Sequence, residues 1–191
     1  MKLEKEITVK VNYDYDSLHN DLISKGFKIV EEYQVNDIYL LPDVINMDLL
    51  SVTEILKSCV LIRDVVGIVK KLVCKYKKYN EEKEIIEQGK VECGIESIKD
   101  TFNFMERIGY INLFEINDKC IVYSNNEIAI VVEVVNDKYL FIELEETNEH
   151  ISKKYSSIEE MKNDLISIGL DLDYSSFSVR KAEIVFNEKY R

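Results

Sequence analysis

Carboxylates and amines recur at alternate positions of segments that read as β-strands. The segment EKEITVKV at 4–11 places Glu4, Glu6, Thr8 and Lys10 on one parity and Ile7, Val9 and Val11 on the other. Because side chains alternate across a strand, such a segment has one polar face and one mostly apolar face. A polar face turned to water is the ordinary explanation, and an ion-binding interior is the alternative.

The signs of these charges are sorted by strand. Acids dominate the first and last strands and bases the middle ones, with one further acid inside an apolar strand. The residues are Glu4, Glu6, Glu143, Glu145, Arg63, Lys75, Lys77 and Glu133. A solvated surface does not need such sorting, but a site for a metal-bound polyphosphate does. Mg²⁺ and Mn²⁺ prefer carboxylate oxygens, whereas phosphate oxygens bind Lys and Arg.

Three segments have the signals of amphipathic helices, at 17–26, 97–109 and 157–169. Each begins with a serine, carries apolar residues at helical spacing and ends in a glycine. A serine N-cap and a glycine stop are independent signals of helix ends. The stretches DLISKGF and DLISIGL resemble each other, which indicates two weakly similar halves, roughly 1–95 and 96–191.

The rest of the chain reads mostly as strands rich in β-branched and aromatic residues. The segments are 4–12, 28–33, 36–41, 59–65, 68–79, 85–94, 110–116, 119–124, 127–135 and 138–146. Short joints such as Asn136-Asp137 suit antiparallel turns. We therefore predict an α+β fold with one domain over 1–191. It would be an antiparallel β-barrel of about eight strands, with helices outside and the charged faces lining the lumen.

Composition limits the possible partners. The net charge of −11 disfavours nucleic acid, and no apolar run is long enough for a membrane span, so we expect neither partner. Charges in the N-terminal MKLEKEITVK argue against a signal peptide, and a cytoplasmic protein is expected. The four cysteines lack C-x-x-C spacing, so a zinc site has little support and buried free thiols are favoured.

The order of these motifs resembles the CYTH proteins, also called triphosphate tunnel metalloenzymes, which include class IV adenylyl cyclases and thiamine triphosphatases. EKEIT matches a Glu-x-Glu-x-Lys strand through Glu4 and Glu6, with Thr8 at the lysine position and Lys10 one step further. LIR matches through Arg63, LVCK through Lys75, and FIELE matches a closing Phe-x-Glu-x-Glu strand. The resemblance extends from Glu4 to about Lys181.

Further residues are assigned by this resemblance alone. KVE stands for an Arg-x-Glu pair through Lys90 and Glu92, and DKCIVY matches a Lys-x-Arg strand through Lys119, with Ile121 replacing the arginine. Glu133 stands at the position of an aspartate. The departures at Thr8 and Ile121 remove two cations that the family uses for phosphate.

The resemblance implies a metal-dependent triphosphate hydrolase with a small anionic triphosphate as its ligand. Glu4, Glu6 and Lys10 would be catalytic, and Glu4, Glu6, Glu143 and Glu145 would hold Mg²⁺ or Mn²⁺. The phosphate-binding residues would be Arg63, Lys75, Lys77, Lys90 and Lys119, with Glu92 and Glu133 as further tunnel carboxylates. The alternatives are a non-catalytic nucleotide or polyphosphate binder on the same fold, and a class IV-type adenylyl cyclase. A homodimer is a further open alternative.

Overall fold

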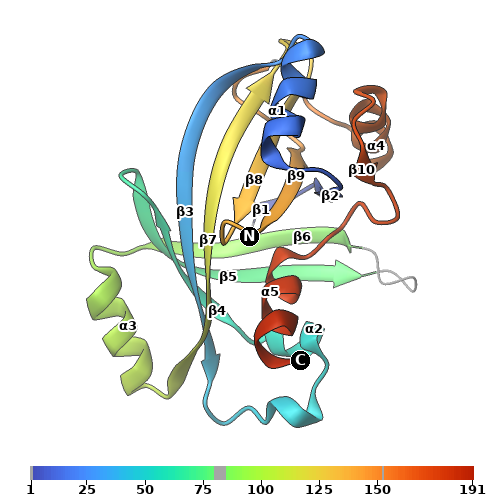
Figure 1. Cartoon of the computed structure of the whole chain (residues 1–191). Coiled ribbons are helices and arrows are strands. Elements are labelled where there is room, and N and C mark those ends of the chain that lie inside the picture. Colours follow the sequence, from blue (N-terminus) through green and yellow to red (C-terminus); the bar gives the residue numbers. More distant parts are fainter. Residues whose placement is uncertain (1, 80–84, 152) are drawn as a thin grey trace. The chain divides into compact units, whose positions relative to one another are not determined.

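The computed structural model describes residues 2–79, 85–151 and 153–191, except the side chains of residues 2–4, 79, 86 and 87. Within these ranges the chain forms ten strands and five α-helices (Figure 1). The strands are β1 (Lys2–Glu4), β2 (Glu6–Val11), β3 (Lys28–Pro42), β4 (Val60–Val65), β5 (Val69–Tyr79), β6 (Ile85–Gly94), β7 (Tyr110–Ser124), β8 (Ala129–Val135), β9 (Tyr139–Glu145) and β10 (Leu172–Asp173). The helices are α1 (Tyr15–Ser24), α2 (Val52–Lys57), α3 (Ile98–Arg107), α4 (Ile158–Ser167) and α5 (Lys181–Tyr190), with a short 3₁₀ helix at Met47–Leu49.

The strands follow the hydrogen-bonded order β1-β6-β5-β4-β3-β7-β8-β9-β2-β10. The chain forms two compact units, each discontinuous in sequence. Unit 1 contains residues 34–117 and 180–191 with the N-terminal residues up to Leu3, and unit 2 contains residues 4–33 and 118–179. Strands β3 and β7 each have residues in both units. The units mix residues from both halves of the sequence, and the weak internal repeat stays a prediction.

The sheet of unit 1 has an apolar face covered by a helix. Leu40, Ile62 and Met105 form a buried cluster, so Met105 of α3 packs on the face of β3 and β4 that carries Leu40 and Ile62. Antiparallel pairing places Arg63 opposite Asp37 on β3 and opposite Lys71 on β5. Because directly opposite residues share a face, this charged row lies on the side away from α3.

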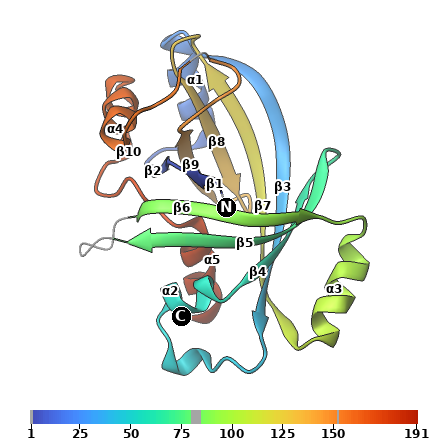
Figure 2. The ribbon, with the colours of Figure 1, turned by 180° about the vertical axis from the view of Figure 1, so that it is seen from behind.

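The sheet of unit 2 follows the same plan with two helices. Its larger apolar cluster joins alternate residues of β2, β8 and β9 to α1 and α4 (Figure 2). Leu18 and Leu22 of α1 and Met161 and Leu165 of α4 are fully buried there. The apolar parity of the opening segment, Ile7, Val9 and Val11, belongs to this cluster. Its polar parity therefore lies on the opposite face.

The three predicted helices are present, and the joint at Asn136 and Asp137 is a tight turn with φ of 52° and 54°. Asp14, not Ser17, caps α1, because its carboxylate accepts the Ser17 backbone N–H at 2.9 Å. Helices α2 and α5 were not predicted from the sequence, and β3 and β7 were each predicted as two strands.

The α+β class and the antiparallel sheet are confirmed, with more strands than predicted. Within the described residues the strand order has two ends, at β1 and β10, and closure into a barrel is not observed. The barrel stays a prediction. No helix in the described ranges is both long and apolar enough to cross a membrane.

The packing of α4 on unit 2 generates a stability prediction. Leu165 is completely buried, so Leu165→Ala should lower the free energy of unfolding by about 3 kcal/mol through lost burial and a residual cavity. Ile166 is 48% exposed on the same helix, and Ile166→Ala should cost less than about 0.5 kcal/mol. Urea unfolding of the two variants checks the contrast. Equal losses would show that α4 does not cover the sheet.

Candidate functional site

A partly buried ion pair organises the charged face of unit 1. The Arg63 guanidinium donates to both carboxylate oxygens of Asp37, with Nε–Oδ1 at 2.7 Å and Nη2–Oδ2 at 2.6 Å. Asp37 is 5% exposed. Burial alone would raise the pKa of Asp37, but the hydrogen bonds and charge of Arg63 outweigh it and the pKa is lowered. Asp37 is therefore ionised at neutral pH, and it fixes the guanidinium plane.

Like charges lie directly opposite each other on the same face. Lys75 of β5 pairs with Lys90 of β6, and Lys77 follows two residues later on the Lys75 side of β5. Like-charged cross-strand pairs are destabilising. Burial, followed by the nearby charge of Arg63, lowers the pKa of Lys75 to about 8. By its accessible surface, however, Lys75 is an exposed residue, so water screens these effects on its ammonium.

Lys181 extends this set of cations and was not assigned from sequence. It is the first residue of α5, and its charge acts on Asp37 and Lys75. Aromatic contacts hold α5 in unit 1, because Phe186 packs edge-on against Phe114, which in turn stacks on Tyr39 at 4.5 Å between ring centroids. No short motif marks Lys181, since only tertiary packing brings this helix to the sheet.

Glu92 belongs to the basic face and not to the carboxylates of unit 2. Its Oε1 accepts a hydrogen bond from Lys71 Nζ at 2.6 Å. This ion pair lies beside the Lys75–Lys90 pair, because Glu92 and Lys90 are two residues apart on β6 and so share a face. We name the set Asp37, Arg63, Lys71, Lys75, Lys77, Lys90, Glu92 and Lys181 the basic face.

Carboxylates gather on the polar face of unit 2. Glu6 of β2 lies directly opposite Glu145 of β9, and Thr8 lies opposite Glu143. Lys10, two residues further along β2, is exposed and pairs with Phe141. Glu4 ends β1, and its side chain lies outside the described part of the structure. The structure thus brings Glu6, Glu143 and Glu145 together, and their oxygen donors suit Mg²⁺ or Mn²⁺.

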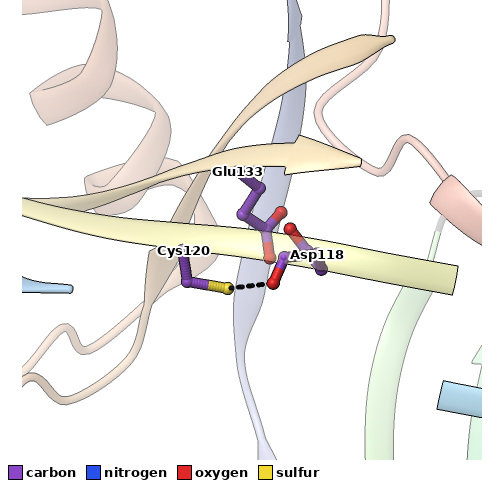
Figure 3. Close-up of side chains that lie close together, drawn as sticks. All are labelled: Asp118, Cys120 and Glu133. Atoms are coloured by element: carbon purple, nitrogen blue, oxygen red, sulfur yellow. Dashed lines mark hydrogen bonds between the residues drawn. The ribbon is translucent and has the colours of Figure 1, made fainter. Parts of the chain in front are cut away.

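A second group on this face contains residues that the sequence analysis did not join. Asp118 and Cys120 of β7 and Glu133 of β8 each offer a ligand atom, and these atoms lie within 4.8 Å of one another (Figure 3). Cys120 and Glu133 are directly opposite in the strand register. The pKa of the nearby Tyr33 is raised. The largest cause is burial, and the next is the negative charge of the surrounding groups, which are Cys120, Glu145, Glu143 and Glu133. We name Glu6, Glu143, Glu145, Asp118, Cys120 and Glu133 the acidic face.

The structure does not place Lys119 with these carboxylates. Lys119 lies one residue from Cys120, so its side chain belongs to the opposite face of β7, where its Nζ pairs with Asp137 Oδ1 at 2.5 Å. Ile121 shares that parity and is part of the apolar cluster. The positions on the acidic face are therefore 118 and 120, one residue away from those that the motif comparison indicated.

The cysteines only partly follow expectation. All four are free thiols, and Cys59 and Cys120 are buried, but Cys74 and Cys93 are exposed. The expectation of burial was wrong for these two, because their parity on β5 and β6 lies on an outer face of the sheet that is exposed at those positions.

Comparison with known proteins supports the fold. No protein-family profile matches the sequence, and no curated protein is a detectable sequence relative. Solved structures do match over nearly the whole chain. A candidate adenylate cyclase from Vibrio parahaemolyticus matches with a TM-score of 0.60 at 12% identity, over 97% of this chain and 98% of its own. The Hippeastrum protein HpAC1, a candidate adenylyl cyclase with a dominant triphosphatase activity, matches with a TM-score of 0.60 at 12% identity, over 99% and 96%.

This chain shares their fold. PH1012 from Pyrococcus horikoshii OT3 also matches, with a TM-score of 0.60 at 15% identity, over 91% of this chain and 97% of its own. At these identities the likeness establishes the fold alone. It agrees with the resemblance to CYTH proteins that the order of the sequence motifs indicated.

The Asp37–Arg63 pair makes a testable contribution. Because its folded pKa is lowered, Asp37 stabilises the protein above its unfolded pKa of about 3.9, and this contribution is lost as the pH falls through the folded pKa. Asp37→Asn should therefore cost roughly 2 kcal/mol at pH 7 and much less at pH 3. Urea unfolding at both pH values measures the difference. The control is Asp64→Asn on the opposite face of β4, and a loss for Asp37→Asn that is equal at both pH values would contradict the assignment.

Proposed function

We propose that this chain is a Mg²⁺- or Mn²⁺-dependent hydrolase of triphosphate-containing small molecules, such as inorganic triphosphate, thiamine triphosphate or a nucleoside triphosphate. The observation that carries the proposal is the placement of Lys75 directly opposite Lys90, on one face with Arg63. Like charges placed directly opposite each other cost stability, and a bound polyanion relieves the repulsion. The fold shared with HpAC1 supports the same chemistry.

The basic face supplies the groups that a phosphoryl transfer needs. Arg63, oriented by Asp37, offers its remaining N–H donors to phosphate oxygens, while Lys75, Lys77 and Lys90 act as point charges. Such preorganised cations stabilise the charge that develops on the phosphoryl oxygens in the transition state. Lys181 would add a further cation from α5.

The acidic face would hold the metal ion. Glu6, Glu143 and Glu145 provide oxygen donors, and Glu4 is assigned to the same set by its motif. A bound Mg²⁺ or Mn²⁺ would supply Lewis-acid activation of a phosphoryl oxygen and of water. Lys10 keeps its proposed catalytic assignment as an exposed cation on the same parity. The β-tunnel that the sequence predicts remains part of the proposal.

A non-catalytic polyphosphate binder is the second candidate. It is favoured by Thr8, and by Asp118 and Cys120, since none of these residues adds a cation to the acidic face. A class IV-type adenylyl cyclase is the third, supported by the fold shared with candidate cyclases. The three functions differ in their products from ATP, which are phosphate, none, or cyclic AMP with pyrophosphate.

Hydrolysis is tested with the purified full-length chain, Mg²⁺ or Mn²⁺, and each of the three substrates in turn. We expect metal-dependent release of phosphate. Arg63→Gln should reduce kcat/KM by 100-fold or more, corresponding to about 3 kcal/mol of lost transition-state stabilisation. The control Lys70→Met changes a lysine on the opposite face of β5 and should leave the rate unchanged. Cyclic AMP as the product would identify a cyclase instead.

Calorimetry with inorganic triphosphate separates a binder from a hydrolase. Tight binding without product after long incubation would favour the binder. Absence of both binding and turnover in wild-type protein would overturn every function in this class.

Metal binding to the acidic face predicts a shift in thermal stability. Glu6 and Glu145 repel each other across β2 and β9, so millimolar Mg²⁺ or Mn²⁺ should raise the melting temperature. In a Glu6→Gln/Glu145→Gln variant the metal-free protein should melt higher than the wild type, and the added metal should raise it less. A metal-induced shift of the same size in both proteins would place the metal elsewhere.

A further inference from the structure

We propose that Asp118, Cys120 and Glu133 form a binding site for a thiophilic divalent cation of the zinc class, separate from the Mg²⁺ or Mn²⁺ ligands. Backbone register places the three residues together. Asp118 and Cys120 are two apart on β7 and share a face, and Glu133 is the direct cross-strand partner of Cys120. Figure 3 shows the carboxylate groups and the thiol converging from the two strands.

The burial of the three groups makes a cation favourable. Asp118, Cys120 and Glu133 are 6%, 3% and 4% exposed. Ionised carboxylates in such surroundings are costly unless a proton or a cation offsets their charge. Tyr33 is affected by the charges of Cys120 and Glu133 together with those of Glu143 and Glu145, so the wider surroundings add further negative charge. A divalent cation compensates two charges at once.

The donor set selects the class of metal. Mg²⁺ and Mn²⁺ prefer all-oxygen sites, whereas a thiolate combined with carboxylates suits Zn²⁺ and its softer analogue Cd²⁺. Zinc bonds of about 2.3 Å to sulfur and 2.1 Å to oxygen place tetrahedral ligand atoms roughly 3.5 Å apart. The ligand atoms here lie within 4.8 Å of one another, so shifts of about 1 Å in their positions would bring them to zinc-binding distances. Three protein ligands leave a fourth position for water.

The other buried cysteine, Cys59, provides a matched control. Both buried thiols donate to a backbone carbonyl oxygen, Cys59 Sγ to Ile55 at 3.3 Å and Cys120 Sγ to Asp118 at 3.9 Å. Cys59 differs in its neighbours, because it belongs to no group of three or more metal-ligating side chains among the described residues.

The test uses full-length protein with Cys74→Ser and Cys93→Ser, because exposed thiols would bind soft metals on their own. Titration with Cd²⁺ should produce the ultraviolet cadmium–thiolate charge-transfer band, saturating at one equivalent and releasing protons. Adding Cys120→Ser should abolish the band, and adding Glu133→Gln should weaken Cd²⁺ binding by tenfold or more. Adding Cys59→Ser should leave the titration unchanged.

Zn²⁺ competition identifies the preferred ion. Zn²⁺ should displace Cd²⁺ from the double-serine protein, while a thousandfold excess of Mg²⁺ should not. The rise in melting temperature that Zn²⁺ produces should be lost when Cys120→Ser is added. No band in the double-serine protein, a band that survives in Cys120→Ser, or a band lost in Cys59→Ser would overturn the proposal. Two of these results, no band in the double-serine protein and a band lost in Cys59→Ser, can be obtained even if the Cys120→Ser variant does not fold. Failure here leaves the proposed triphosphate hydrolysis standing, because its metal ligands are Glu4, Glu6, Glu143 and Glu145, and Glu133 is only a further tunnel carboxylate there.

Discussion

Like charges held opposite each other are the constraint on which this structure depends. In unit 1 Lys75 faces Lys90 across β5 and β6, and in unit 2 Glu6 faces Glu145 across β2 and β9. Each arrangement opposes folding by itself. Under the proposed function, an anion bound in unit 1 and a cation bound in unit 2 would relieve this repulsion.

The apolar faces hold these charges in place. Helix α3 covers one side of the unit 1 sheet, and α1 with α4 covers one side of the unit 2 sheet. Because side chains alternate along a strand, fixing the apolar parity under a helix also fixes the charged parity on the other side. The hydrophobic clusters thus determine which ionisable groups lie together, and Asp37 then orients Arg63 within its row.

Parity explains how much of the site could be predicted from the sequence. Alternation along 4–11 and 139–145 correctly placed Glu6, Glu143 and Glu145 on one face, and the serine and glycine signals predicted α3 and α4. On β7 the motif comparison selected Lys119, and a shift of one residue reverses every side chain. Hence Asp118 and Cys120, treated as unremarkable, are the residues beside Glu133.

Tertiary packing explains the remainder. Lys181 joins the basic face only because Phe186 anchors α5 to Phe114, a contact between residues far apart in sequence. The zinc-class group was missed for a related reason. Its ligands come from an Asp-x-Cys pair and a cross-strand glutamate, so it contains none of the Cys and His spacings by which zinc sites are recognised. The spacing of residues along one strand does not show which residue of the neighbouring strand lies opposite, so the sequence did not reveal that Glu133 meets Cys120.

The most direct test of this account measures two properties of a Lys75→Met variant: its free energy of unfolding and its affinity for inorganic triphosphate. The wild-type pKa of Lys75, lowered to about 8, means that the charged form is disfavoured in the folded protein. The substitution should therefore raise the unfolding free energy below pH 8, with a gain that shrinks toward pH 10.5, while the affinity for inorganic triphosphate falls at least tenfold. A variant that loses stability, or that binds triphosphate as well as the wild type, would contradict the account.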